Sequence, residues 1–426
     1  MKSSNLGKYA LSLAVSVALL SGCAVLRRAQ DDMQPPLAAA TAGGKIKHIV
    51  YIVQERRSFD NLFQGYPGAN TVPKGMNSNG QTITLQPVSL KKAYKIDDSA
   101  GAMFAACNGT DRLPGIDCKM NGFNKEESFG GPANPQYVYV PHDESKPYFE
   151  MAHEWVVGDK MFASRLDQSF AASQYTIAAQ AGRAVDLPNA NWGCDGAPGD
   201  TIQTLTEKRT FGRSEFPCFE YQTLGGELEN AGLSWRYYTS TTGTDSYASI
   251  KGTYWQAHIV TPPQQFLKDV AGGKLANFTW ITPTCLDSDN GACGGGYGPS
   301  WVAALVNTIG KSKFWDSTAI FVQRDDWGGF YDHVPPPYEN FDGLGFRVPL
   351  LVISPYAKRD YVAHVEYETA SVLRFAEDTY GLGQLAAADK RATSPAADCF
   401  DFSQKPRLFV PIKAPKGTKF FLHQRS

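Results

Sequence analysis

Two apolar runs in this chain end on carboxylates, and this pattern limits what the chain can fold into. Residues 46–54 lead to Glu55, and residues 318–323 lead, after one arginine, to Asp325 and Asp326. In a parallel α/β sheet, the carboxyl ends of the strands open onto the ligand-binding crevice. Three carboxylates gathered there would repel one another unless a cation lay among them, and oxygen ligands suit a hard divalent metal. The pattern therefore predicts a metal-dependent site on an α/β scaffold.

Helix-like and strand-like segments alternate through the chain after residue 140. Apolar periodicity and glycine stops predict helices at residues 147–155, 170–180, 224–231, 263–270, 300–309 and 366–380, and apolar strands at residues 233–238, 278–281, 319–323 and 348–353. Such alternation predicts a mostly parallel central sheet with helices on both faces. Residues 64–140 are dense in Gly, Pro, Asn and Ser, and predict a long loop insertion. No linker divides residues 45–410, so we expect one domain over residues 45–426.

The charges of the chain nearly cancel. Its 426 residues include 41 Lys and Arg against 42 Asp and Glu. A nucleic-acid-binding protein usually carries an excess or a patch of positive charge. We therefore expect no nucleic-acid partner, and the sequence indicates no particular oligomeric state.

The first residues have the pattern of an export signal. Lys2 and Lys8 precede an apolar run at residues 9–20, which is too short to span a bilayer as a stable helix. The run ends in Leu-Ser-Gly-Cys at residues 20–23, which resembles a bacterial lipobox.

That resemblance implies three parts. Residues 1–22 would be a signal peptide, Cys23 would be lipidated and anchor the chain to a membrane, and residues 23–44 would be a tether rich in Ala, Pro and Gly. The protein would then be an envelope lipoprotein of the outer membrane or periplasm. The alternative is an ordinary secretory signal that is cleaved nearby.

The remaining cysteines fit export into an oxidising compartment. Their proximity in sequence suggests three local disulfides, Cys107 with Cys118, Cys194 with Cys218 and Cys285 with Cys293, which leaves Cys399 unpaired. Buried thiols are the alternative for each pair. No Cys-x-x-Cys motif is present, which disfavours a zinc cluster.

Ser169 stands just ahead of the apolar run at residues 170–180. A hydroxyl at the start of a helix faces its positive end and its free N–H groups, which favours a nucleophile and also holds a phosphate. Serine is equally a common N-cap, and Ser173 is a local rival.

Several motifs in this chain together resemble one family. Residues 55–60, Glu-Arg-Arg-Ser-Phe-Asp, are similar to the Glu-Asn-Arg-Ser-Phe-Asp signature of the bacterial phosphoesterase family, which contains phospholipases C and metal-dependent acid phosphatases. Its other blocks resemble residues 168–170, 298–301, 325–333 and 348–355. The likeness runs from about residue 46 to about residue 410.

The resemblance implies an alkaline-phosphatase-like fold and the hydrolysis of phosphoric esters. It implies that Glu55, Asp325 and Asp326 ligate one divalent cation, whose identity stays open, and that Ser169 forms a phosphoryl-enzyme intermediate. The substrate would be a phosphomonoester or a phospholipid headgroup ester. We favour an acid-phosphatase-like activity, because no amphipathic surface helix argues for a phospholipase.

This chain departs from the family pattern at three positions. Arg56 replaces an asparagine that ligates the metal, Asn290 stands where an active-site imidazole is expected, and Arg324 precedes the paired aspartates. A guanidinium cannot ligate a cation. Three options follow for Arg56: the metal is bound weakly by the remaining carboxylates, the side chain turns away, or it clamps the substrate phosphate.

These departures keep a second hypothesis open, namely an envelope-anchored phosphate-ligand-binding protein that has kept the fold and lost the chemistry. His333 also has two interpretations. It could be the general acid toward the leaving group, or a loop histidine that is hydrogen-bonded locally.

Overall fold

The computed structural model describes residues 44–241 and 246–424, which belong to one compact unit that begins at residue 41. The predicted signal peptide, Cys23 and nearly all of the tether lie outside the described residues and stay predictions. Among the described residues, no helix is both long and apolar enough to cross a membrane.

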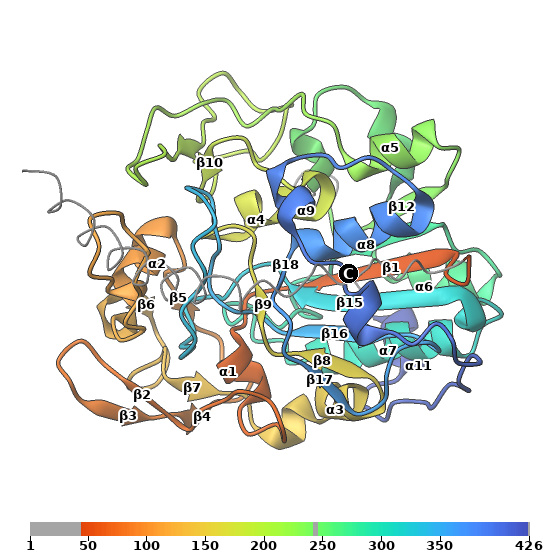
Figure 1. Ribbon diagram of the computed structural model, residues 1–426, viewed down its shortest axis with the longest axis horizontal. Coiled ribbons are helices and arrows are strands. Elements are labelled where there is room, and N and C mark those ends of the chain that lie inside the picture. The colour runs from red at the N-terminus through yellow and green to blue at the C-terminus, as the bar shows by residue number, and fades with distance from the viewer. Residues whose placement is uncertain (1–43, 242–245, 425–426) are drawn as a thin grey trace, which may run out of the picture. The chain divides into compact units, whose positions relative to one another are not determined.

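Eight strands form the central sheet (Figure 1). Their spatial order is β13 (Ile259–Val260), β12 (Trp235–Tyr238), β14 (Phe278–Ile281), β1 (His48–Gln54), β15 (Thr318–Arg324), β16 (Leu350–Ile353), β8 (Val156–Gly158) and β17 (Tyr361–Ala363). Every neighbouring pair is parallel except the two pairs that include β16. The prediction of a mostly parallel sheet is therefore confirmed.

Helices cover both faces of this sheet (Figure 1). One group contains α3 (His142–Glu154), α6 (Gln265–Ala271), α7 (Gly298–Gly310) and α11 (Thr418–His423), and the other contains α4 (Ser169–Ala178), α5 (Leu224–Asn230), α8 (Ala370–Tyr380) and α9 (Ala387–Arg391). The short helix α10 (Ala396–Cys399) contacts β17. Since β1 and β15 are covered on both sides, nearly all of their residues are buried, which explains their continuous apolar sequences.

The two apolar runs that end on carboxylates are neighbours at the centre of the sheet. Strands β1 and β15 pair in parallel register, from His48 opposite Thr318 to Gln54 opposite Arg324. The next N–H, that of Asp325, donates to the carbonyl of Gln54 at 2.9 Å. Glu55 and Asp325 therefore leave the sheet side by side.

The insertion at residues 64–140 has more structure than its composition predicts. It follows α1 (Phe59–Phe63) and contains α2 (Ala100–Cys107), the 3-10 turn η1 (Phe123–Lys125) and the short strands β2 (Lys74–Met76), β3 (Thr82–Thr84), β4 (Gln86–Pro87), β5 (Lys95–Ile96), β6 (Ser128–Phe129) and β7 (Val138–Tyr139). These elements gather at the end of the sheet where β1 finishes (Figure 1). They share a second hydrophobic cluster, in which Met103 and Phe123 pack with Trp327 and Phe346.

The remaining elements are short. They are the strand pairs β9 (Met161–Phe162) with β18 (Tyr367–Glu368) and β10 (Ala184–Val185) with β11 (Gln203–Thr204), and the 3-10 turns η2 (Ser246–Ser249), η3 (Tyr254–His258) and η4 (Trp315–Ser317). The three disulfides predicted from proximity are all present, and Cys399 is a buried free thiol. Burial raises the pKa of Cys399 to about 12, so this thiol is un-ionised at neutral pH.

Candidate active site

The carboxyl ends of β1 and β15 and the first turn of α4 bring the predicted site residues together. The Ser169 hydroxyl donates to Oδ2 of Asp326 at 3.1 Å. Oδ1 of Asp325 accepts the N–H groups of Arg56 at 3.0 Å and of Asp326 at 2.8 Å. The structure thus brings Ser169, Asp325 and Asp326 to one edge of the sheet, while their catalytic and metal-binding roles stay predictions.

Ser169 is the first residue of α4 and is available for chemistry. Gln168 occupies the N-cap position without a side-chain capping bond, so the Ser169 hydroxyl is not used as a cap. Ser169 lines a cavity of about 290 Å³ together with Glu55 and Asp325. The rival Ser173 also lines this cavity, but its hydroxyl donates to the carbonyl of Phe170 at 2.8 Å.

Arg56 points into the site. Its Nε donates to Oγ of Ser169 at 3.3 Å and lies 3.9 Å from Oδ2 of Asp326. The option that this side chain turns away is therefore wrong. Burial alone would lower the pKa of Arg56, but the carboxylates of Asp98, Asp326, Glu55 and Asp325 outweigh burial and raise it. The guanidinium is a permanent positive charge among four acids.

Asp98 is a site residue that the sequence did not reveal. Its Oδ2 lies 3.0 Å from Nη1 of Arg56 in an ion pair, and the residue is fully buried. Burial raises the pKa of Asp98, while Arg56 lowers it. Asp98 lies in the insertion, just before the N-cap Ser99 of α2. An acidic residue before a helix was a local signal, but its contact with residue 56 depends on how the insertion packs.

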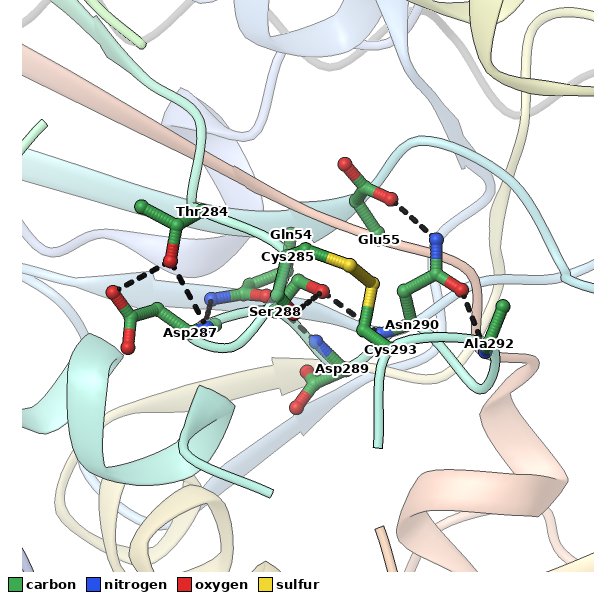
Figure 2. The surroundings of a disulfide bond; sticks show 10 residues. All are labelled: Gln54, Glu55, Thr284, Cys285, Asp287, Ser288, Asp289, Asn290, Ala292 and Cys293. Carbon is green, nitrogen blue, oxygen red and sulfur yellow. Dashed lines mark hydrogen bonds between the residues drawn. A yellow bond between two sulfur atoms is a disulfide. The ribbon is translucent and has the colours of Figure 1, made fainter. Parts of the chain in front are cut away.

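Asn290 holds the carboxylate of Glu55 (Figure 2). Its side-chain N–H donates to Oε2 of Glu55 at 2.7 Å, from a loop that the disulfide between Cys285 and Cys293 closes. Gln54 fastens the same loop by accepting the N–H of Asp289 at 3.1 Å. Burial and then the charge of Asp325 raise the pKa of Glu55, and the hydrogen bond from Asn290 opposes them. Asn290, which stands where an imidazole was expected, therefore supplies a neutral hydrogen-bond donor to Glu55.

Arg324 does not add a second positive charge to the site. Its guanidinium is fully buried, pairs with Asp289 and lies over the ring of Tyr148 at 4.4 Å from the centroid. The Tyr148 hydroxyl donates to the same carboxylate at 2.8 Å. Because Arg324 contacts Asp289 and Tyr148, whereas Arg56 contacts Ser169 and Asp326, Arg56 is the departure that changes the site.

His333 is not brought to Ser169. Its Nδ1 lies 2.6 Å from Oδ2 of Asp60, its Nε2 lies 3.0 Å from Oδ1 of Asn70, and it is not among the residues that line the cavity. The local interpretation of His333 therefore fits the structure, and its role as general acid stays a prediction without geometric support.

The ligand atoms of Asp60, Asp332 and His333 lie close enough together to hold a metal. Among the described residues, these are the three acidic, histidine or cysteine side chains whose ligand atoms all lie within 4.8 Å of one another. Their carboxylates are already engaged, since Arg347 donates to Asp332 at 3.0 Å and lies 3.4 Å from Asp60. The arrangement is that of a buried ion-pair network.

The predicted ligands Glu55, Asp325 and Asp326 do not fit a resident metal as they lie here. The ligand atoms of one magnesium or calcium ion lie about 2.0–2.6 Å from it, and so within about 5 Å of each other. These three carboxylates are not among the groups of described residues that meet that spacing. The guanidinium of Arg56 lies instead beside Asp326, and Asn290 engages Glu55.

Comparison with known proteins agrees with the motifs. The phosphoesterase family model matches residues 46–383. The chain is 25% identical over 427 residues to phospholipase C A of Mycobacterium tuberculosis (86% of this chain, 79% of the relative), and 26% identical over 361 residues to non-specific phospholipase C1 of Arabidopsis thaliana (75% and 63%).

Among solved structures, the fold is similar to a protein in the alkaline phosphatase superfamily from Vibrio parahaemolyticus, with 10% identity and a TM-score of 0.37 over 80% of this chain and 68% of that chain. This TM-score is too low for the likeness to support a further conclusion. The match of the family model over most of the chain, with its phospholipase C relatives, is decisive: the chain belongs to the phosphoesterase family and is a phosphoric-ester hydrolase.

Proposed function

We propose that this protein is an exported phosphatase of phospholipase C type in which Ser169 is the nucleophile. The observation that carries the proposal is the hydrogen bond from the Ser169 hydroxyl to Asp326 at 3.1 Å, beside Arg56 and at the edge of the cavity. A nucleophilic hydroxyl needs a neighbouring acceptor for its proton and a positive charge near the developing alkoxide, and both are within reach here.

The reaction divides into two displacements. The Ser169 oxygen forms a bond to phosphorus while the bond from phosphorus to the ester oxygen breaks, and the serine proton passes to Asp326. Asp326 then gives this proton to the ester oxygen, and the alcohol leaves. In the second displacement water gives a proton to Asp326 as its oxygen bonds to phosphorus, the bond from phosphorus to Ser169 breaks, Asp326 returns the proton to the Ser169 oxygen, and phosphate is released. In both steps the Arg56 guanidinium and the free N–H groups at the start of α4 stabilise the phosphoryl oxygens.

Export is part of the same proposal. Three disulfides close loops around the sheet, and such bonds persist in oxidising compartments. Together with the lipobox-like residues 20–23, they support an envelope lipoprotein that is anchored through Cys23. Labelling with a radioactive fatty acid tests this, because Cys23→Ser would abolish the label, whereas an ordinary secreted protein would carry none in either form.

Hydrolysis is tested by comparing two serines that line one cavity. Turnover of a chromogenic phosphomonoester and of phosphatidylcholine vesicles would be measured across pH for the parent, Ser169→Ala and Ser173→Ala. We expect Ser169→Ala to lower kcat by about 10³-fold or more and Ser173→Ala to stay within about threefold. Loss of turnover in Ser173→Ala with activity retained in Ser169→Ala would show that the nucleophile is misassigned. The preferred substrate separates the phosphatase from the phospholipase.

One observation favours the second candidate, a phosphate-ligand-binding protein. The ion pair of Arg56 with Asp326 neutralises charge that the family resemblance assigns to a metal. If the parent protein shows only background turnover of both substrates but binds phosphate, this candidate is correct and the hydrolase proposal is wrong.

A further inference from the structure

The positive charge beside Ser169 is a side chain of the protein, the guanidinium of Arg56. Arg56 Nε is 3.3 Å from the serine oxygen and 3.9 Å from Asp326 Oδ2. A cation that activates the serine and neutralises Asp326 is expected in this region, and the guanidinium already lies there. Its planar fork of donors also matches the oxygens of a phosphate group.

Asp98 fixes that charge in place. It is fully buried, and apart from the Arg56 guanidinium no donor among the described residues contacts its carboxylate oxygens. Its ion pair with Arg56 is therefore what compensates its charge. An uncompensated buried carboxylate is costly, so Asp98 strongly favours this one position of the arginine.

The backbone of Arg56 is constrained as well. Its φ is +52°, in the left-handed region that few side chains other than glycine, asparagine and aspartate adopt easily. Gly328 packs directly on it, because a Cβ at Gly328 would come within 2.6 Å of the Arg56 carbonyl oxygen and 2.8 Å of its Cβ. The arginine is thus held at a strained position by close packing and by its ion pair.

Part of the guanidinium stays free for a ligand. Nε and Nη1 face Ser169 and Asp98, and no acceptor among the described residues takes a hydrogen bond from Nη2. The Arg56 side chain is 14% exposed, whereas that of Asp98 is 1% exposed. Of these two side chains, the arginine is therefore the one that solvent reaches.

We propose that Arg56, held by Asp98, is the resident cation of this site and binds the substrate phosphate without a divalent metal. The proposal rests on the proposed function for its identification of the site as a phosphate site. It names Arg56 as a residue that touches substrate and Asp98 as the positioning residue. It also makes this chain differ from the metal-dependent pattern that the family resemblance implies.

Binding measurements test this inference apart from turnover. The full protein would be treated with EDTA, dialysed and titrated by calorimetry with inorganic phosphate, and separately with Mn²⁺ and with Ca²⁺. We expect phosphate to bind the metal-free protein and neither ion to bind stoichiometrically. Because removal of Arg56 alone would strand the charge of Asp98, the test variant is the double substitution Arg56→Ala with Asp98→Asn.

We expect the double variant to bind phosphate about 10- to 100-fold more weakly, the effect of losing charge-assisted hydrogen bonds. Arg359→Ala removes an exposed arginine that is paired with Glu154 and should leave the affinity unchanged. Asp98→Asn alone should weaken phosphate binding less than the double variant, because the arginine remains but is no longer fixed. Circular dichroism confirms that each variant is folded.

Two results would overturn the inference. One is a single Mn²⁺ or Ca²⁺ ion bound per parent chain with phosphate binding that requires it, and the other is full phosphate affinity in the double variant. Failure of the proposed function looks different. A parent protein that binds phosphate through Arg56 but hydrolyses no ester would contradict the hydrolase proposal and leave the inference intact.

Discussion

Arg56 and Arg347 both lie among buried carboxylates, but their donors are used differently. Arg347 is fully buried; its Nε donates to both oxygens of Asp332 at 3.0 and 3.2 Å, and its Nη1 donates to the carbonyls of Asn70 and Asp159 at 2.9 and 2.8 Å. Its guanidinium also lies over the ring of Phe59, 4.6 Å from the centroid. Its Nη2 has no partner closer than Asp60 at 3.4 Å among the described residues, but the side chain is fully buried, so no ligand reaches it.

Arg56 contacts carboxylates but retains an open side. Its partners are Asp98, Asp326 and the Ser169 hydroxyl, and its side chain is 14% exposed, although it does not itself line the cavity of Ser169. The same residue types therefore make a structural tie in one place and a candidate ligand site in the other. What separates the two is exposure, because the Arg347 side chain is fully buried whereas that of Arg56 is 14% exposed.

The comparison predicts that replacing the two arginines lowers the free energy of unfolding by different amounts. Arg347→Ala would leave Asp60 and Asp332 buried without their counter-charge, so we expect a loss of about 3–5 kcal/mol in the free energy of unfolding. The double substitution Arg56→Ala with Asp98→Asn removes both charges of the closest pair and leaves Asp326 with the hydrogen bond from Ser169, so it should cost less, about 1–2 kcal/mol. Urea unfolding measures both, and equal losses would contradict the distinction.

A buried acid that forms no ion pair among the described residues extends the comparison. Glu377 of α8 is 1% exposed; burial, and then the proximity of Asp389, raise its pKa to about 10. A carboxyl whose pKa is raised on folding contributes stability that is fully present below its unfolded pKa and is lost as the pH rises through the folded value. The parent protein should therefore lose stability between pH 6 and pH 8.

We expect the free energy of unfolding of the parent to fall by about 2 kcal/mol between pH 6 and pH 8, and Glu377→Gln should make this fall smaller. Glu207, whose side chain is 76% exposed, provides the matched control, since Glu207→Gln should follow the parent. Thermal unfolding at each pH gives the slopes. A variant that loses as much stability as the parent would show that Glu377 is not the titrating group.

The parts of the fold that the sequence predicted well are set by local pattern. The strands that end before Glu55 and Asp325 were found because continuous burial demands apolar residues along their whole length. The disulfides were found because each one closes a short loop. The helix at residues 100–107 was missed, because its run of Ala, Gly, Met and Phe has no polar face to reveal a period.

The parts of the site that the sequence missed depend on long-range packing. Asp98 reaches Arg56 because the insertion packs its Met103 and Phe123 against the loop that follows β15. His333 is the last residue of a family motif in the sequence, yet Asp60 engages its ring. Neither outcome is encoded near the residue concerned, so no local pattern could reveal it.

Asn290 gives the finest test of the comparison, because it decides whether Glu55 is restrained by the protein as the carboxylates around Arg347 are. Asn290→Ala removes the donor at 2.7 Å from Glu55 while the disulfide between Cys285 and Cys293 keeps the loop in place. A hydrogen bond to a charged group contributes about 1.5–3 kcal/mol when buried, and less at the half-buried Glu55.

We therefore expect kcat/KM to fall about three- to tenfold, with the free energy of unfolding lowered by about 1 kcal/mol or less. Ser288→Ala, in the same loop, removes a hydroxyl that donates to the carbonyl of Cys285 and accepts the backbone N–H of Asn290, and so controls for disturbance of the loop around Asn290. If Ser288→Ala lowers kcat/KM as much as Asn290→Ala, the effect comes from the loop. If Asn290→Ala changes nothing, the carboxylate of Glu55 needs no support from this loop, because it is positioned from within the cluster that contains Arg56.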